Sequence, residues 1–504
     1  MTIRKPCPEA PGPLEAYARQ FDACFGSLAQ RRAFRAYLQG LLLPRDRNKT
    51  LTALAGTEPV VGAQHPAAQQ LQYFLSEAAW EAPAVNARRL ELLLTDPATV
   101  PHAGGVLVID DTGDRKAGAH TAHVGRQYLG SVGKLDNGIV AVTSLWADER
   151  VYYPLHVAPY TPARRLPRGP ADPAFRTKPQ LAVQLVAAAG ATGVPFRAVV
   201  ADCFYGDSLA FEEGLWEAGL PFVLALKPKK GHWAPVDEVH TPVEAARDVP
   251  WHGPRRPGGW TRVVRRFRDG HAAIWWVADA RLAGYGPDRS TRLVVATTDP
   301  ARLPALSTWY LVTNLPRPGS PRAATSPFAA ADLAEVVRLY GLRTWVEQGY
   351  KQVKGELGWA DFQVRAARAI RRHWTLVCCA FAFCWRAWFA ARRTAWPPPP
   401  PETRLPPDPA TPPPAPAGRG GKEAAAAGPA PARHAAPPRH PPALARLAGG
   451  AALRPQLARA LDRSLAHLAG LALSGPAPRT AVAPRPRRGR LLPAPLSPAL
   501  TNYR

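Results

Sequence analysis

The sequence predicts a mixed α/β sheet flanked by helices, and three observations support this fold class. Short apolar runs of strand composition follow one another from residue 106, first as a meander and then alternating with helical patterns. A segment of helical periodicity precedes them, and a segment of strand character interrupts the alternation after residue 228. A strand meander followed by helix–strand alternation is typical of a mixed sheet with helices on both faces.

Composition limits the class of protein. The 504 residues suggest two or three domains, and 46% hydrophobic content is enough for a sizeable core. Lysine and arginine number 64 against 38 acidic residues, and this net charge of +26 favours a polyanionic partner such as nucleic acid. The alternative is a basic protein from an arginine-rich proteome.

The cysteine pattern and the hydropathy indicate the cellular compartment in which the protein is expected. The six cysteines form no CxxC pair, which argues against a zinc site or a disulfide framework and fits a reducing cytosol. The N-terminal residues have no apolar leader, and the longest apolar run, 376–385, is too short to span a bilayer. We expect a cytoplasmic, nucleoid-associated protein with no membrane partner.

The elements then follow in order. Residues 14–95 are predicted to be helical, and their arginines make 1–98 a candidate DNA-binding domain, with a packing or dimerisation domain as the alternative. The first part of the sheet, 99–228, is predicted to contain strands at 106–110, 138–147, 150–158, 196–202 and 222–227 and helices at 179–191 and 208–219.

The second half contains three further segments. Residues 229–315 are interpreted as an all-β insertion with strands at 260–268, 271–279, 291–298 and 309–314. Helices at 330–341, 344–357 and 368–391 complete the core over 316–396. Residues 397–504 hold 26 of the 58 prolines and few acidic residues, so we expect a mostly disordered tail.

Carboxylates stand where an α/β sheet forms its sites. Asp110 and Asp111 end the first strand, Asp202 ends the strand after the first helix, and Glu347 lies on a helix beyond the insertion. Carboxylate oxygens suit Mg²⁺, and a pair of such ions suits cleavage and transfer of phosphodiesters. The alternative is that each residue caps a helix or pairs with an arginine. A Walker-type phosphate loop is absent from the sequence, which argues against nucleotide hydrolysis.

The most specific pattern is Tyr340-x2-Arg343-x3-Glu347-x6-Lys354. If one helix continues through Gly341, these four side chains fall near one helical face. Cations flanking a metal-binding carboxylate can hold the phosphates on either side of a scissile bond. The alternative is an exposed helix carrying salt bridges.

These four residues resemble the YREK signature of bacterial insertion-sequence transposases, the cut-and-paste group of the RNase H-like DDE superfamily. The resemblance covers residues 14–395 and includes the blocks VLVIDDTGDRKAGAHTAHVGRQYLGSVGKLDN, VVADCFYGD and WVEQGYKQVKGELGWADFQVR. It implies an RNase H-like mixed sheet that is interrupted by the β-rich insertion and joined to the helical N-terminal domain and the Pro-rich tail.

The resemblance also implies roles. It assigns the catalytic and metal-binding carboxylates to Asp111, Asp202 and Glu347, with the adjacent Asp110 as a lesser candidate for the first position. It implies two Mg²⁺ ions, for which Mn²⁺ is expected to substitute. The DNA-binding residues it suggests are Tyr340, Arg343 and Lys354 of the signature and Trp309 stacked on a flipped base, with a core tryptophan as the alternative. Lys116, Arg126 and Lys134 lie in the long connection after Asp111 and are candidates for contact with the DNA backbone, with solvated side chains as the alternative.

The expected function is transposition. The partners would be the terminal inverted repeats and target DNA, with a homodimer in the synaptic complex. Two alternatives stay open: an RNase H-like nuclease without strand transfer, and an inactive DNA-binding protein domesticated from a transposase. Lys227, Lys229 and Lys230 follow the last predicted core strand and are further candidates for backbone contact, with solvated lysines as the alternative.

Overall fold

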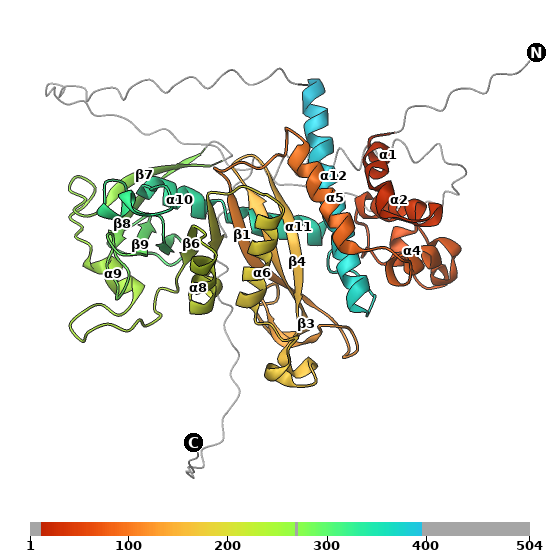
Figure 1. Ribbon diagram of the computed structural model, residues 1–504, viewed down its shortest axis with the longest axis horizontal. Helices are drawn as coiled ribbons and strands as arrows, with labels where there is room; N and C mark the ends of the chain where they lie inside the picture. Colours follow the sequence, from red (N-terminus) through yellow and green to blue (C-terminus); the bar gives the residue numbers. More distant parts are fainter. Residues whose placement is uncertain (1–11, 268–270, 396–504) are drawn as a thin grey trace, which may run out of the picture.

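The computed structural model describes residues 12–267 and 271–395, and its named strands join in one mixed sheet (Figure 1). The strands are β1 (Val106–Arg115), β2 (Gly125–Leu129), β3 (Lys134–Ala147), β4 (Tyr152–Tyr160), β5 (Ala198–Ala201), β6 (Phe222–Ala225), β7 (Thr261–Arg266), β8 (Ala272–Ala280), β9 (Arg292–Thr297) and β10 (Thr308–Thr313).

Helices surround this sheet. The α-helices are α1 (Pro13–Ala18), α2 (Leu28–Leu42), α3 (Leu51–Leu54), α4 (Pro66–Ser76), α5 (Ala82–Thr95), α6 (Lys178–Ala191), α7 (Cys203–Gly206), α8 (Leu209–Glu217), α9 (Pro242–Asp248), α10 (Leu333–Gly341), α11 (Thr344–Gly355) and α12 (Ala367–Ala395). Short 3-10 turns lie at Arg19–Cys24, Val61–Gln64, Ala163–Arg165, Gly169–Ala171 and Pro321–Ala324.

The strand order is β2-β3-β1-β5-β6-β10-β9-β8-β7, and β4 also pairs with β3. β1, β5 and β6 run parallel, while β1 and β4 lie antiparallel to β3. α6 and α8 lie on one face, and α10, α11 and α12 lie on the other (Figure 1). The predicted mixed sheet with helices on both faces is therefore confirmed.

The sheet extends further than the sequence indicates. β1 continues five residues beyond the predicted end at 110, because its second half pairs with β3 as far as Arg115 opposite Gly138. The hairpin strand β2 is absent from the prediction. Its exposed Arg126 and Tyr128 alternate with inward residues, but Gly125 and Gly130 weaken the local strand signal.

The segment interpreted as an all-β insertion is not entirely β. It contains the helix α9, which begins with a capping box between Thr241 and Glu244. Its strands do not form a separate sheet, because β10 pairs antiparallel with β6 from Leu311 to Thr313. This pairing covers the edge that β6 would otherwise present to solvent with unpaired backbone groups.

The N-terminal helices pack against α12, which in turn packs on β4 of the sheet. The hydroxyl of Tyr17 donates to the carbonyl of Cys379 at 3.0 Å, and the hydroxyl of Tyr37 lies 2.8 Å from Nδ1 of His373. Residues of α2, α5 and α12 belong to the same buried apolar cluster as the sheet. The helical segment and the sheet therefore share one core.

The apolar run at 376–385 lies in α12, which confirms the helix predicted at 368–391. Over Ala367–Arg392 this helix is long and apolar enough to cross a membrane, judged by length and composition only. Its most apolar window is 67% buried inside the protein, as in the core helix of a soluble protein. Arg371 and Arg372, which precede the apolar run in the sequence, also lie within this helix.

The five cysteines in the described part of the chain are free: Cys24, Cys203, Cys378, Cys379 and Cys384. Cys7 and the predicted Pro-rich tail, 397–504, lie outside the described residues.

Arg89 connects α5 to β4 and yields a first prediction. Its fully buried guanidinium donates to the carbonyls of Pro154 and Leu155, both at 2.8 Å, and to Asn86. Arg89→Met should lower the free energy of unfolding by about 2–4 kcal/mol because it leaves buried acceptors without donors. Urea denaturation measures this, and exposed Arg32→Met should change it by less than about 0.5 kcal/mol. Equal values for the two variants would contradict the prediction.

Candidate active site at the carboxyl edge of the sheet

The β1–β5 register brings two aspartates level with each other. The two strands pair in parallel up to Ile109 opposite Ala201, so Asp110 and Asp202 are the next residues on each strand. Asp202 then caps α7, with its carboxylate accepting from the amide of Phe204 at 3.0 Å. Asp202 directly follows the short strand β5, so its carboxylate lies at the carboxyl edge of the sheet.

Arg343 gathers three carboxylates. Its guanidinium donates to Asp110 at 2.9 Å and lies 3.9 Å from the carboxylate of Asp202 and 3.5 Å from that of Glu347. Asp110 and Arg343 are largely buried, whereas the Glu347 side chain is 59% exposed. Like charges are therefore held together by one shared cation.

Asp111 points to the opposite face of the sheet, as expected for a neighbour in a strand. Its carboxylate lies 3.2 Å from the ammonium of Lys178, the first residue of α6. It also accepts from the hydroxyl of Tyr205 at 3.3 Å. The structure therefore brings Asp110, and not Asp111, into contact with the cation shared by Asp202 and Glu347.

Burial dominates the electrostatics of this cluster. It raises the pKa of Asp110 to about 7, against the opposing effect of Arg343 and with added repulsion from Asp202 and Asp111. Burial likewise raises the pKa of Tyr350, whose hydroxyl lies 2.5 Å from that of Thr143 on β3. A site that holds carboxylates at this density favours cations.

The helix carrying the signature is nearly continuous, which is the condition for its four side chains to fall near one helical face. α10 ends at Gly341 and α11 begins at Thr344, but Leu342 and Arg343 keep helical backbone angles. The amides of Arg343 and Val346 bond to carbonyls three residues earlier, so the helix tightens here for one turn.

The four signature residues do not share one environment. Tyr340 is buried, which raises its pKa to about 12, and its ring lies 4.9 Å from that of Trp309. Lys354 pairs with Asp114 at 2.6 Å and donates to the carbonyl of Gly113 on β1. Only Arg343 and Glu347 lie in the carboxylate cluster.

Trp309 is half-buried in β10 and enclosed by other side chains. The Trp275 ring lies 4.6 Å away, and the Arg265 guanidinium lies 4.5 Å from the Trp309 ring centroid. A base could stack on Trp309 only after these neighbours moved. The stacking role stays a prediction, and the contacts favour packing.

The other predicted basic residues lie apart from the carboxylates. Lys116 donates to the carbonyls of Ala360 and Phe362 and lies 3.6 Å from the Phe362 ring, which ties the end of β1 to the segment after α11. Arg126 and Lys134 are exposed on the β2–β3 hairpin. Counted along β3 from the partner of Asp110, they lie roughly 20–30 Å away.

Sequence reasoning missed Lys178, Tyr205, Thr143 and Tyr350. The capping box between Thr177 and Gln180 marks the start of α6 and could have placed Lys178 at a helix N-terminus. Nothing in its spacing shows that its ammonium reaches Asp111, since the two residues lie 67 positions apart and meet only through the packing of α6 on the sheet.

Within residues 12–267 and 271–395, no group of three His, Cys, Asp or Glu side chains is arranged to hold a metal ion. The donor set is nevertheless suitable, because Asp110, Asp202 and Glu347 offer only oxygen atoms and already share a cation in Arg343. Asp110, Asp202 and Glu347 are therefore the residues that would hold a divalent cation.

Comparison with known proteins defines the class. Residues 20–282 match the family model described as DDE superfamily endonuclease, so the chain belongs to that family. The match includes Asp110, Asp111 and Asp202 and ends before Glu347.

A relative narrows the class to transposases of insertion sequences. The chain is 32% identical over 363 residues to the "Probable transposase for insertion sequence element IS701" of Microchaete diplosiphon. The alignment covers 71% of this chain and 84% of that relative. The predicted family, an insertion-sequence DDE transposase, is thereby confirmed.

The enclosure of Trp309 gives a second prediction. Trp309→Ala should lower the free energy of unfolding by about 2–4 kcal/mol, because it leaves a cavity where Trp275, Tyr340 and Arg265 contact the indole ring. Trp233→Ala is the matched control, since Trp233 is 89% exposed and should change stability by less than about 0.5 kcal/mol. A Trp309→Ala protein of normal stability whose cleavage defect is rescued by an abasic DNA end would instead support base stacking.

Proposed function

We propose that this transposase binds the terminal inverted repeats of its element, cleaves DNA at both ends and joins the freed 3′ ends to target DNA. The observation that supports this best is the meeting of Asp110, Asp202 and Glu347 at one edge of the sheet around Arg343. Residues separated by up to 237 positions converge there, and crowding carboxylates around the largely buried Asp110 is costly unless they bind a cation.

The core is proposed to be an RNase H-like fold. β4, β3, β1, β5 and β6 form a mixed unit with the parallel strands at the site, and β7–β10 are the insertion between Asp202 and Glu347. The N-terminal segment predicted as a domain at 1–98 is proposed to bind DNA, and two active sites for two DNA ends imply a homodimer. A cytoplasmic protein at the nucleoid fits these partners.

We assign the β1 metal ligand to Asp110 in place of Asp111. Asp110 faces Arg343, which also lies near Asp202 and Glu347, whereas Asp111 faces Lys178 on the other side of the sheet. Mg²⁺ held by Asp110, Asp202 and Glu347 would activate the attacking oxygen and stabilise the leaving one. Mn²⁺ offers the same oxygen preference and is expected to substitute.

The protein's own cations complete this chemistry. Arg343 neutralises the carboxylates and lies where it would contact a phosphate placed on them. Lys178 holds Asp111 and adds positive charge on the opposite face of β1. Tyr205 donates to Asp111 and so keeps it fixed as an acceptor.

The carboxylate assignment gives a third prediction. Asp110→Asn, Asp202→Asn and Glu347→Gln should each reduce cleavage of a labelled element end at least about a hundredfold, with end binding retained. Chelation by EDTA should stop the wild-type reaction, and added Mg²⁺ or Mn²⁺ should restore it. Asp111→Asn is the control and should have the smaller effect. Full activity of Asp110→Asn with loss in Asp111→Asn would return the assignment to Asp111.

DNA binding gives a fourth prediction. A basic protein that neutralises many phosphates releases counterions, so affinity for an element end should fall by about a thousandfold between 50 and 200 mM salt. Gel shifts across that range measure the slope. A flat response would mean that few phosphates are contacted and would contradict a broad basic interface.

The nuclease alternative differs in its product. A nuclease without strand transfer would cut the end and leave it free, whereas a transposase would yield products covalently joined to a target plasmid. Sequencing these products distinguishes the two activities.

A further inference from the structure

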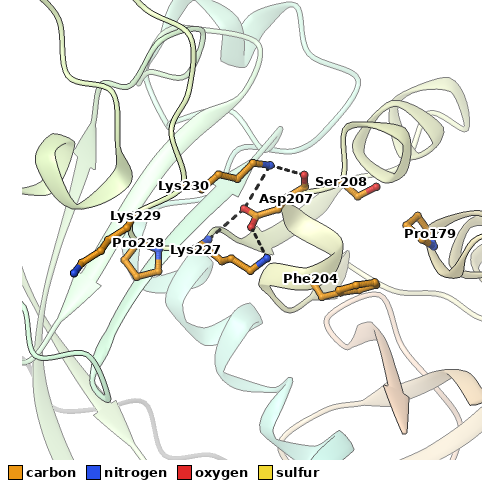
Figure 2. A pocket seen from close by; sticks show the side chains of 8 residues that line it. All are labelled: Pro179, Phe204, Asp207, Ser208, Lys227, Pro228, Lys229 and Lys230. Carbon is orange, nitrogen blue, oxygen red and sulfur yellow. Dashed lines mark hydrogen bonds and ion pairs between the residues drawn. The ribbon is translucent and has the colours of Figure 1, made fainter. Parts of the chain in front are cut away.

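Two basic surfaces lie on either side of the carboxylates. In the strand order β2-β3-β1-β5-β6, Asp110 on β1 lies between the β2–β3 hairpin and β6. At the end of β6, an open cavity of about 790 Å³ beside the active site is lined by Lys227, Lys229 and Lys230 (Figure 2). The hairpin on the other side carries exposed apolar side chains as well as cations.

The hairpin exposes its apolar side chains at the tip. Tyr128 on β2 and Leu135 on β3 lie directly opposite each other and are 57% and 59% exposed. Val132, in the connecting turn, is 39% exposed. Leaving apolar groups in water is unfavourable, and a cluster of them on the surface marks a contact site. The hairpin tip is therefore a candidate surface for binding a partner.

The same part of the hairpin is basic. Arg126 lies two residues before Tyr128 and so shares its face of the strand, and Lys134 directly precedes Leu135. Both cations are exposed, and residues 116–135 contain no Asp or Glu. The apolar tip is therefore framed by positive charge.

Neighbouring residues keep this charge positive. Arg164, from the segment after β4, is exposed and donates to the carbonyl of Arg126 at 2.9 Å. Asp136, next to Leu135, accepts from the guanidinium of Arg115 at 2.9 Å, so its charge is already compensated. A second copy of this chain, with a net charge of +26, would bring more positive charge to the tip. The surface therefore fits a polyanion better than another copy.

The hairpin is held firmly on the sheet. Leu129 of β2 is fully buried, and its side chain fills the space where a Cβ on Gly113 or Gly138 would stand. The hydroxyl of Ser131 in the turn donates to the carbonyl of Gly113 at 2.6 Å. The tip is thus presented at a fixed distance from the carboxylates, and such preorganisation lowers the entropic cost of binding.

That distance is less than one helical turn of DNA. Thr143 lies opposite Asp110, and Leu135 lies eight residues earlier on β3, which is about 26 Å at the rise of a strand. B-DNA rises about 3.4 Å per base pair. A duplex lying along the strands with one phosphodiester at the carboxylates would therefore meet the tip about eight base pairs away.

We propose that the hairpin tip inserts Tyr128 and Leu135 as an apolar wedge between two base pairs of the target duplex, while Arg126 and Lys134 hold the phosphates beside it. Apolar side chains inserted from the minor groove unstack a base step and bend the duplex. The cost of unstacking is offset by the additional contacts that a bent duplex makes with the protein.

The target duplex is the expected partner because it is continuous. The inference rests on the proposed function, in which a cleaved element end stops at the active site whereas the target passes through it. The target therefore extends from the carboxylates in both directions and reaches the hairpin. A wedge selects DNA by its ease of deformation and not by base edges, so it acts on targets of many sequences.

The test compares wild type with the double variant Tyr128→Ala, Leu135→Ala on pre-cut element ends, so that joining is measured without cleavage. Joining to a target plasmid should fall about tenfold, and cleavage of uncut ends should stay near the wild-type rate. Wild type should also bend a short target duplex, measured by energy transfer between dyes at its two ends, and the double variant should not.

The positions of insertion give an independent readout. Wild-type insertions should be enriched in TA and CA/TG steps about eight base pairs from the join, because these steps unstack most easily. Sequencing of the products measures this enrichment, which the double variant should lose. The conservative pair Tyr128→Phe, Leu135→Met should retain all three signals. Tyr73→Ala is the matched control, since Tyr73 is 62% exposed on α4 and should change none of them.

Three outcomes would overturn the proposal. The first is wild-type joining, bending and step enrichment in the double variant. The second is an equal loss of end cleavage and joining, which would place the tip on the element's own end. The third is a change of oligomeric state in sedimentation without DNA, which would make the tip a contact between copies. If the double variant melts lower than wild type, Tyr128→Ser and Leu135→Ser decide by the same bending measurement.

The bending measurement separates this inference from the proposed function, because it needs neither cleavage nor joining. A protein that bends the duplex through the tip but never joins element ends would refute strand transfer alone. A protein that joins ends at the wild-type rate after loss of Tyr128 and Leu135 would refute the wedge alone.

Discussion

Repulsion among carboxylates is the constraint around which the active half of this protein is built. Asp110, Asp202 and Glu347 come from β1, the end of β5 and α11, and each would oppose the approach of the others. The Arg343 guanidinium makes their proximity tolerable, and it can do so because the turn between α10 and α11 stays helical. Moving that turn by one residue would rotate Arg343 away from Asp110.

The sheet explains why this arrangement is rigid. β1 is paired on both sides, with β3 antiparallel and β5 parallel, so Asp110 and Asp111 cannot exchange faces without breaking both ladders. The two faces consequently have separate cations. Arg343 serves the face covered by α10 and α11, and Lys178 serves the face covered by α6.

Contacts with β10 and β1 hold the helix that carries Arg343 and Glu347 in position. β10 extends the sheet from β6 and carries Trp309, whose ring contacts Tyr340 on the helix just before Arg343. Lys354 pairs with Asp114 on β1 at the far end of the signature. The signature helix is therefore held at both ends by contacts with the sheet, which sets the height of Glu347 above the strands.

The sequence by itself determined the family, the mixed sheet, most strand positions and the helices at 330–341 and 344–357, because these depend on local periodicity and motif spacing. It placed Asp202 and Glu347 in the candidate site, and for the first position it favoured Asp111 over the adjacent Asp110 through the family resemblance alone. Only strand pairing and the packing of α6 and α11 decided which face each carboxylate meets. The same holds for Lys178, for the enclosure of Trp309 and for the extension of the sheet through β10, since all three arise from contacts between residues far apart in the chain.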